Sequence, residues 1–171
     1  MAQSKLKPAR TTPVVSPKAD SQPPLTPAAA DMRDAILEAV HSGRIDDLRH
    51  AIELNELKPD FGAAPGADPI QHLKALSRDN SGTDILAALR ALLDSPRKSV
   101  PAGKDPENNL IYNWPRFADE PLSKLSTEDT ALLERIETPD TLQAMKASDR
   151  YTGWQLRIGA DGIWHGFTRL R

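Results

Sequence analysis

The chain has no cysteine among its 171 residues. This absence excludes disulfide bonds, thiolate zinc sites, iron–sulfur clusters and cysteine nucleophiles. It does not identify a compartment, because a chain without thiols is compatible with a reducing cytoplasm and equally with an oxidising periplasm.

Long apolar runs and an excess of basic charge are also lacking. No run of about eighteen apolar residues is present, so the sequence predicts no transmembrane segment, and the residues given include no charged-then-apolar leader. The formal net charge is −2, from 22 Lys and Arg residues against 24 Asp and Glu residues. We therefore expect no nucleic-acid partner, since attraction to a phosphate backbone requires a basic excess.

Residues 1–30 differ in composition from the rest of the chain. They contain six of the 15 prolines, few bulky apolar side chains, and more basic than acidic residues. Such a stretch cannot offset the entropy of ordering, so we predict a disordered Pro-rich linker or tail over residues 1–30. The segment 24–27 also fits the P-x-x-P pattern of ligands for proline-binding domains, which is the alternative interpretation.

Residues 31–171 are predicted to form a single helical domain. Apolar side chains recur with helical spacing from an N-cap at Asp31 up to Gly43, and again over residues 46–54, which indicates a helical hairpin. Further helices are expected to begin after Asp68, Ser81 or Thr83, Ser126, and Thr138. Residues 55–67 and 95–109 are expected to be loops.

The helix after Thr83 carries the strongest apolar stripe in the sequence. Leucine and isoleucine recur there on one helical face, which predicts that this helix lies at the centre of the core. The residues of the stripe are Ile85, Leu86, Leu89, Leu92 and Leu93.

The C-terminal segment, at about residues 153–170, alternates with period two around Asp161–Gly162 and predicts a β-hairpin. A two-residue turn would place Trp164 opposite Gly159, whereas a type I turn with a left-handed Gly162 would pair Ile158 with Trp164. We favour this bulged register because it buries the apolar side chains together. It places Trp154, Leu156, Ile158 and Trp164 on one face, and Gln155, Arg157, His165 and Arg169 on the other.

The predicted fold class is therefore mainly α with a C-terminal β-hairpin, a small α+β fold in which helical hairpins pack with an aromatic-rich hairpin subdomain. Three segments, in the same order, resemble a family of small exported alphaproteobacterial proteins of uncharacterised function: residues 111–118 with a Tyr-x-Trp-Pro element, residues 121–126, and residues 157–165 with an Asp-Gly-x-Trp element. The resemblance implies export and no particular activity. The chain departs from that family at residues 168–171, where family members end in apolar and then acidic residues.

No sequence pattern for metal, cofactor or nucleophilic chemistry is present. The four histidines are scattered, and H-E-x-x-H, G-x-S-x-G and glycine-rich phosphate loops do not occur. We therefore predict no catalytic residue, no metal site and no cofactor. His41 and His50 could approach each other across the helical hairpin, an arrangement that we interpret as a surface feature.

Aromatic and basic side chains near the C-terminus form the most distinctive candidate site. They could line a groove that stacks on a sugar, a peptide or a cation. The interpretation that we favour is that the rings are the core of the α+β subdomain, since a two-stranded hairpin is marginal alone. In the favoured register Arg157 and His165 are cross-strand partners that point away from the core. The candidate ligand groove comprises Tyr112, Trp114, Arg116, Tyr151, Arg157 and His165.

The leading functional hypothesis is a non-catalytic binding or structural module of the bacterial envelope, with an unknown protein or cell-wall partner. The Pro-rich tail would serve as its tether. The alternative is an enzyme acting on cell-envelope glycan or peptide, with His165 or a loop carboxylate as acid–base. Ala2–Gln3 resembles a signal-peptidase cut, which favours a periplasmic or exported protein. In that case Met1 stands in place of a removed leader. Otherwise the protein is cytoplasmic. The sequence does not indicate an oligomeric state.

Overall fold

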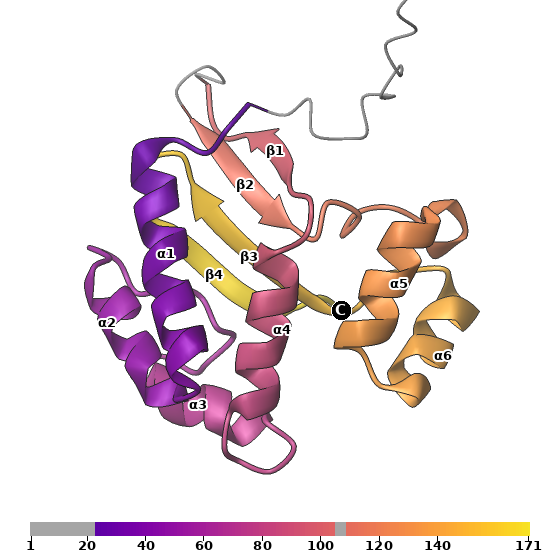
Figure 1. Cartoon of the computed structure of the whole chain (residues 1–171), viewed down its shortest axis with the longest axis horizontal. Coiled ribbons are helices and arrows are strands. Elements are labelled where there is room, and N and C mark those ends of the chain that lie inside the picture. Colours follow the sequence, from indigo (N-terminus) through magenta and orange to yellow (C-terminus); the bar gives the residue numbers. More distant parts are fainter. Residues whose placement is uncertain (1–22, 105–108) are drawn as a thin grey trace, which may run out of the picture.

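A four-stranded antiparallel sheet organises the computed structural model, which describes residues 23–104 and 109–171. The strands lie in the order β1 (Lys98–Pro101), β2 (Leu110–Trp114), β3 (Trp154–Gly159) and β4 (Trp164–Arg169). The described helices gather on one face and at one end of this sheet (Figure 1). The predicted small α+β fold is confirmed, and the sheet is larger than the expected hairpin because β1 and β2 extend it.

The β3–β4 hairpin adopts the bulged register that the sequence favours. Ile158 lies opposite Trp164, and Gly162 takes the left-handed conformation with φ of 85°. The turn is closed by the Gly162 N–H, which donates to the Gly159 carbonyl at 2.9 Å. Trp154, Leu156, Ile158 and Trp164 are all buried, as expected.

A second irregularity at His165 corrects the faces of the residues that follow. Arg157 lies opposite Gly166 rather than opposite His165, which is the extra residue of a bulge. Because side chains alternate along a strand, one extra residue moves every later side chain to the other face. Arg169 therefore lies opposite Trp154 and beside the core. The prediction that Arg169 lies on the outer face is wrong.

Helix α1 (Pro27–Ser42) begins four residues before the expected N-cap at Asp31. Thr26 is the N-cap instead, and its hydroxyl accepts from the Ala29 N–H and donates to the Ala160 carbonyl. Pro27 suits the first helical turn because it lacks an N–H, and Ala29 is fully buried. Residues 27–30, expected as the end of the tail, are therefore helical, and residues 1–22 lie outside the described part.

Four further elements precede the sheet: η1 (Ile45–Asp47), α2 (Leu48–Glu53), α3 (Pro69–Leu76) and α4 (Thr83–Leu93). As predicted, Asp68 caps α3, accepting from the Ile70 and Gln71 N–H groups. The apolar stripe of α4 is buried in the main core together with α1 and the inner face of the sheet. The prediction that α4 lies at the centre of the core is confirmed.

The remaining helices, α5 (Thr127–Ile136) and α6 (Pro139–Ser148), form a second packing unit at the end of the sheet (Figure 1). Ser126 and Thr138 cap them as predicted, and a short 3₁₀ turn, η2 (Leu122–Lys124), packs against α6. The buried side chains of α5 and α6 form a separate cluster with one residue of α4 and two residues of the connecting segments, comprising Ala91, Phe117, Leu132, Leu133, Met145 and Tyr151.

The outer edge of β4 is covered by the loop after α2. The Asp60 N–H donates to the His165 carbonyl and the Phe167 N–H donates to the Asp60 carbonyl, both at 2.9 Å. Asn55 binds the Trp164 backbone from the same side, accepting from its N–H and donating to its carbonyl.

None of the helices in residues 23–104 and 109–171 is long and apolar enough to cross a bilayer.

Candidate functional site

The rings of the predicted groove are core residues. Tyr112 and Trp114 are buried in the main core, and Tyr151 is buried in the α5–α6 cluster. Arg116 is partly buried, and its Nε donates to both oxygens of the buried Asp129 at 3.2 Å. The structure therefore favours the core interpretation for the rings, which present no stacking surface to a ligand.

Arg157 and His165 lie half-buried on the outer face of the sheet and do not join those rings. His165 instead converges with Asp161 on Gly159: a side chain at residue 159 would collide with both. The three residues line a pocket of about 280 Å³ together with Leu110 and other side chains. Asp161 Oδ1 accepts from the Ile163 N–H at 3.0 Å in an exposed hydrogen bond.

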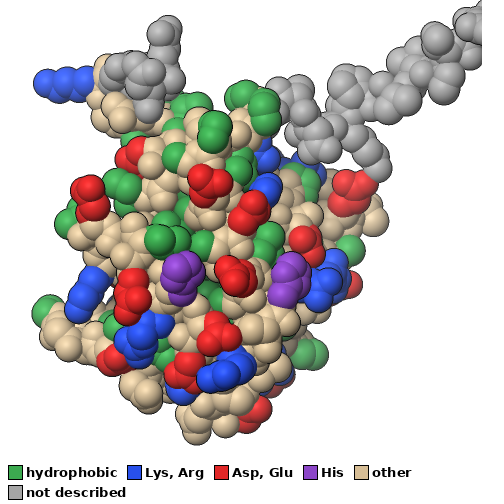
Figure 2. Space-filling model, turned by 60° about the vertical axis from the view of Figure 1, so that its left-hand side comes forward, with side chains coloured by type: hydrophobic (Ala, Val, Ile, Leu, Met, Phe, Trp, Pro, Cys, Tyr) green, Lys and Arg blue, Asp and Glu red, His purple; other side chains and the backbone are tan. Residues whose placement is uncertain are grey.

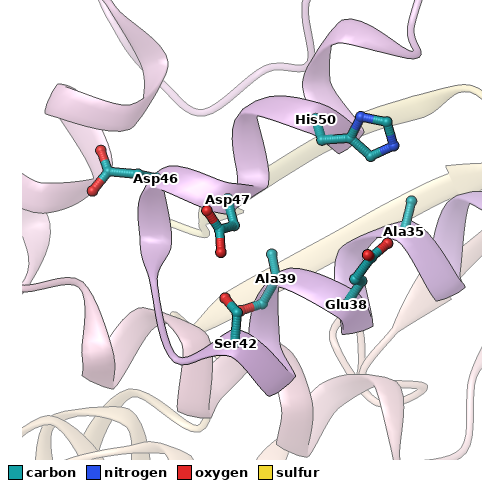
Figure 3. A pocket seen from close by; sticks show the side chains of 7 residues that line it. All are labelled: Ala35, Glu38, Ala39, Ser42, Asp46, Asp47 and His50. Atoms are coloured by element: carbon teal, nitrogen blue, oxygen red, sulfur yellow. The ribbon is translucent and has the colours of Figure 1, made fainter.

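A groove between α1 and the η1–α2 segment has a volume of about 340 Å³ (Figure 3). Asp47 points into it, whereas Asp46 turns away. The Lys74 ammonium group donates a hydrogen bond to Asp46 Oδ1, and this hydrogen bond lowers the pKa of Asp46. His50 lines the groove and His41 does not, so no histidine pair faces it. Figure 2, turned to bring the α1 side forward, shows acidic and histidine side chains close together there. Within the described residues, no cluster of three or more metal-binding side chains occurs.

The cleft between α4 and the α5–α6 unit is larger, at about 450 Å³, and brings together residues that are far apart in sequence. We call it the α4–α6 cleft. One part of its lining is apolar: Leu76, Ile85, Ala88, Ile136, Trp154 and Leu170. The other part is polar: Arg78, Asp84, Glu137, Thr138, Thr141, Thr152 and Arg169.

Arg169 is held on two sides in this cleft. Its Nη2 donates to Glu137 Oε2 at 2.8 Å, and its guanidinium lies over the Trp154 indole, 5.2 Å from the ring centroid. The Glu137 side chain is only 2% exposed, whereas that of Arg169 is 38% exposed. An arginine fixed by a carboxylate and by an aromatic face loses little freedom when it binds a further acceptor.

The other carboxylate oxygen of Glu137, Oε1, is buried and has no hydrogen-bond partner within the described part of the chain. It lies against Gly153, since a Cβ at that position would be 2.5 Å from Oε1 and 2.6 Å from the Tyr151 hydroxyl. Burial raises the pKa of the Tyr151 phenol, and the Glu137 charge raises it further. Tyr151 therefore stays neutral and donates to the Trp154 carbonyl at 2.6 Å.

A second pair of charged residues, Asp84 and Arg78, also lines the cleft. Asp84 accepts from the Ser77 hydroxyl and from the backbone N–H of Arg78, so its carboxylate is occupied within the fold. The Arg78 guanidinium is 69% exposed, and its Nε lies 3.9 Å from Asp84, beyond hydrogen-bond distance. Its donors remain available to a ligand.

Sequence reasoning missed the α4–α6 cleft. Glu137 stands directly before the Thr138 cap, where a charged residue is typical of a solvated helix end. Arg169 is assigned to the outer face by strict alternation after the turn. The only local sign of the site is Gly153, since a glycine directly before a strand indicates close approach of another group.

Comparisons with protein-family models, with curated proteins and with solved structures found no match to this chain.

Proposed function

We propose that the protein is a non-catalytic, envelope-associated binding module whose α4–α6 cleft takes a peptide segment of a protein or cell-wall partner. The observation that carries the proposal is Arg169, fixed by Glu137 and Trp154 in a cleft of about 450 Å³. Ligand pockets of this size combine apolar walls with a few well-placed polar groups, and this cleft has both.

A peptide suits the cleft because the lining offers two kinds of contact side by side. The apolar wall includes Leu76, which is 45% exposed although it is a large hydrophobic residue. The Thr152 hydroxyl has no partner within the described residues and is free to hydrogen-bond a peptide backbone. Apolar side chains and backbone groups of one extended segment would thus be bound together.

The assignment to the envelope rests on the sequence. The Pro-rich N-terminal residues would act as a tether. The resemblance to exported alphaproteobacterial proteins supports the same assignment. Fractionation of cells expressing the complete reading frame tests it: we expect the protein in the periplasmic or exported fraction, and a strictly cytoplasmic protein would refute the envelope assignment.

The binding site itself is tested with purified cell-wall muropeptides and with peptides from envelope proteins. We expect ligand-induced changes in the amide NMR spectrum to cluster at the α4–α6 cleft. Thr141→Trp would fill the cleft and abolish these changes. Ala144→Trp, a control on the exposed part of the same helix, should bind as wild type. Changes located elsewhere, or retained in Thr141→Trp, would refute the cleft as the site.

A second candidate function, an enzyme acting on envelope glycan or peptide, is favoured by the pocket that His165 and Asp161 share above Gly159. A histidine beside a carboxylate is a common acid–base pair. The test is to incubate purified cell wall with the full chain and to measure hydrolysis as the appearance of new reducing ends and free amines. Activity lost in His165→Gln would support this function, and absence of hydrolysis by the wild-type protein would reject it.

A further inference from the structure

The hydrogen-bonding groups that the α4–α6 cleft offers to a ligand are mainly donors. Both carboxylates in its lining are occupied or inaccessible: Asp84 accepts from Ser77 and Arg78, and Glu137 is buried with Oε2 bound to Arg169. The orphaned oxygen of Glu137 lies against Gly153, beyond the reach of a bound molecule.

Two guanidinium groups supply most of these donors. Arg169 uses one Nη2 hydrogen bond, and its remaining N–H groups have no partner within the described residues. The Arg78 side chain, as distinct from its backbone N–H, makes only the loose 3.9 Å ion pair with Asp84 within the described residues. A ligand that fits this arrangement is rich in acceptors and carries negative charge, because hydrogen bonds from arginine to a carboxylate are among the strongest that proteins make.

We infer that the α4–α6 cleft recognises the free α-carboxylate at the end of a peptide, with Arg169 as the anchoring group and Glu137 and Trp154 as positioning residues. This inference rests on the proposed function and names the ligand class for the same cleft. The carboxylate accepts from the exposed edge of Arg169, and the side chain of the terminal or preceding residue lies on the apolar wall formed by Leu76 and Ile85.

A monoanionic carboxylate fits better than a phosphate. The carboxylates of Glu137 and Asp84 already stand in the cleft, so a dianion would meet stronger repulsion than a monoanion. An internal peptide segment, by contrast, would offer the remaining N–H groups of Arg169 only neutral carbonyl acceptors, which make weaker hydrogen bonds than a carboxylate does.

The inference is tested with one synthetic peptide in two forms, acetyl-Ala-Ala-Leu-Ala with a free carboxyl terminus and the same peptide with a terminal amide. Binding is measured by calorimetry on the full chain. We expect the free acid to bind at least about tenfold more tightly than the amide, and we expect this preference to weaken as the salt concentration rises. Inorganic phosphate should not compete at concentrations where free acetate does.

Arg169→Lys is the decisive variant, because it keeps a positive charge beside Glu137 but loses the planar fork. We expect it to fold as wild type by circular dichroism and to lose most of the preference for the free acid. The control, Arg90→Gln, removes an exposed α4 arginine that pairs with Asp94 and does not line the cleft. It should leave both affinities unchanged.

The two proposals fail in different ways. Equal binding of acid and amide at the cleft, or an unchanged preference in Arg169→Lys, overturns carboxylate recognition and leaves the binding function standing. Binding of muropeptides or envelope peptides without binding of the synthetic acid does the same. If none of these ligands perturbs the cleft, both the function and the inference are wrong.

Discussion

The Arg169 guanidinium lies between the Trp154 indole, 5.2 Å from its centroid, and the carboxylate of Glu137, 2.8 Å from Nη2. This contact joins the end of β4 to the α5–α6 unit across 32 positions of sequence. Arg169 thereby contributes both to the polar lining of the cleft and to the attachment of the second packing unit to the first.

Replacing Arg169 with alanine should destabilise the fold. The substitution leaves the Glu137 carboxylate buried without the Arg169 cation, and an unsatisfied buried polar group costs about 1–3 kcal/mol. Because Arg169 is 38% exposed, water can enter the vacated space, so we expect the lower half of that range. Urea unfolding measures the loss, and Arg169→Lys should recover much of it. A wild-type midpoint for Arg169→Ala would show that Glu137 needs no partner.

The turn of the C-terminal hairpin was predictable because its determinants are local. Gly162 tolerates a left-handed backbone. The alternation of apolar side chains on both sides of the turn selects the register that buries those side chains. The bulge at His165 lies where a distant loop pairs with β4. The Asp60 backbone pairs on both sides of Gly166, where a Cβ would lie 2.5 Å from the Asp60 carbonyl oxygen, and no local pattern reports that loop.

Helix starts were also predictable where a side chain caps its own helix, as at Asp68, Ser126 and Thr138. Strand β1 was not, because its four residues, which include Lys98 and Pro101, carry no strand alternation and are extended by pairing with β2. The α4–α6 cleft shares this origin. It exists only where α4 meets α5, α6 and β4, so no single segment encodes it.

Trp164→Ala should be among the most damaging single substitutions. The indole is 1% exposed, meets the Phe61 ring edge-on at 5.1 Å, and donates from Nε1 to the Gly166 carbonyl. Removing a buried indole typically costs about 3–5 kcal/mol. Arg157→Ala on the outer face should stay within about 0.5 kcal/mol. Chemical denaturation compares the two, and a reversed order would contradict the assignment of faces in β3 and β4.

Acid should weaken the helix start at α3. The N–H of Gln71 and the cation of Arg49 lower the pKa of Asp68 below its reference value of 3.8. A lowered folded-state pKa contributes stability that is present above pH 3.8 and is lost as the pH falls through the folded-state value.

The measurement for Asp68 is the urea midpoint at neutral pH and at about pH 3. Asp68→Asn keeps a side-chain oxygen for capping but does not titrate, so its midpoint should fall less between these conditions than that of wild type. The control is Ser126→Asn, at a cap whose native residue carries no titratable group. Its pH dependence should equal that of wild type, and an identical dependence in Asp68→Asn would remove Asp68 as a contributor.

Alanine substitutions at Gly153, directly before β3, and at Gly159, the last residue of β3, should differ sharply in their effect on stability. At Gly153 the new methyl group would meet Glu137 Oε1 at 2.5 Å and the Tyr151 hydroxyl at 2.6 Å, and both side chains are buried and held by hydrogen bonds. Such overpacking costs about 1–3 kcal/mol. At Gly159 the obstructing atoms are the ends of the exposed Asp161 and half-exposed His165 side chains, which can turn away. Thermal unfolding should therefore place Gly153→Ala clearly below Gly159→Ala. Equal midpoints would mean that Glu137 moves freely, and the fixed position of Arg169 would then lose its support.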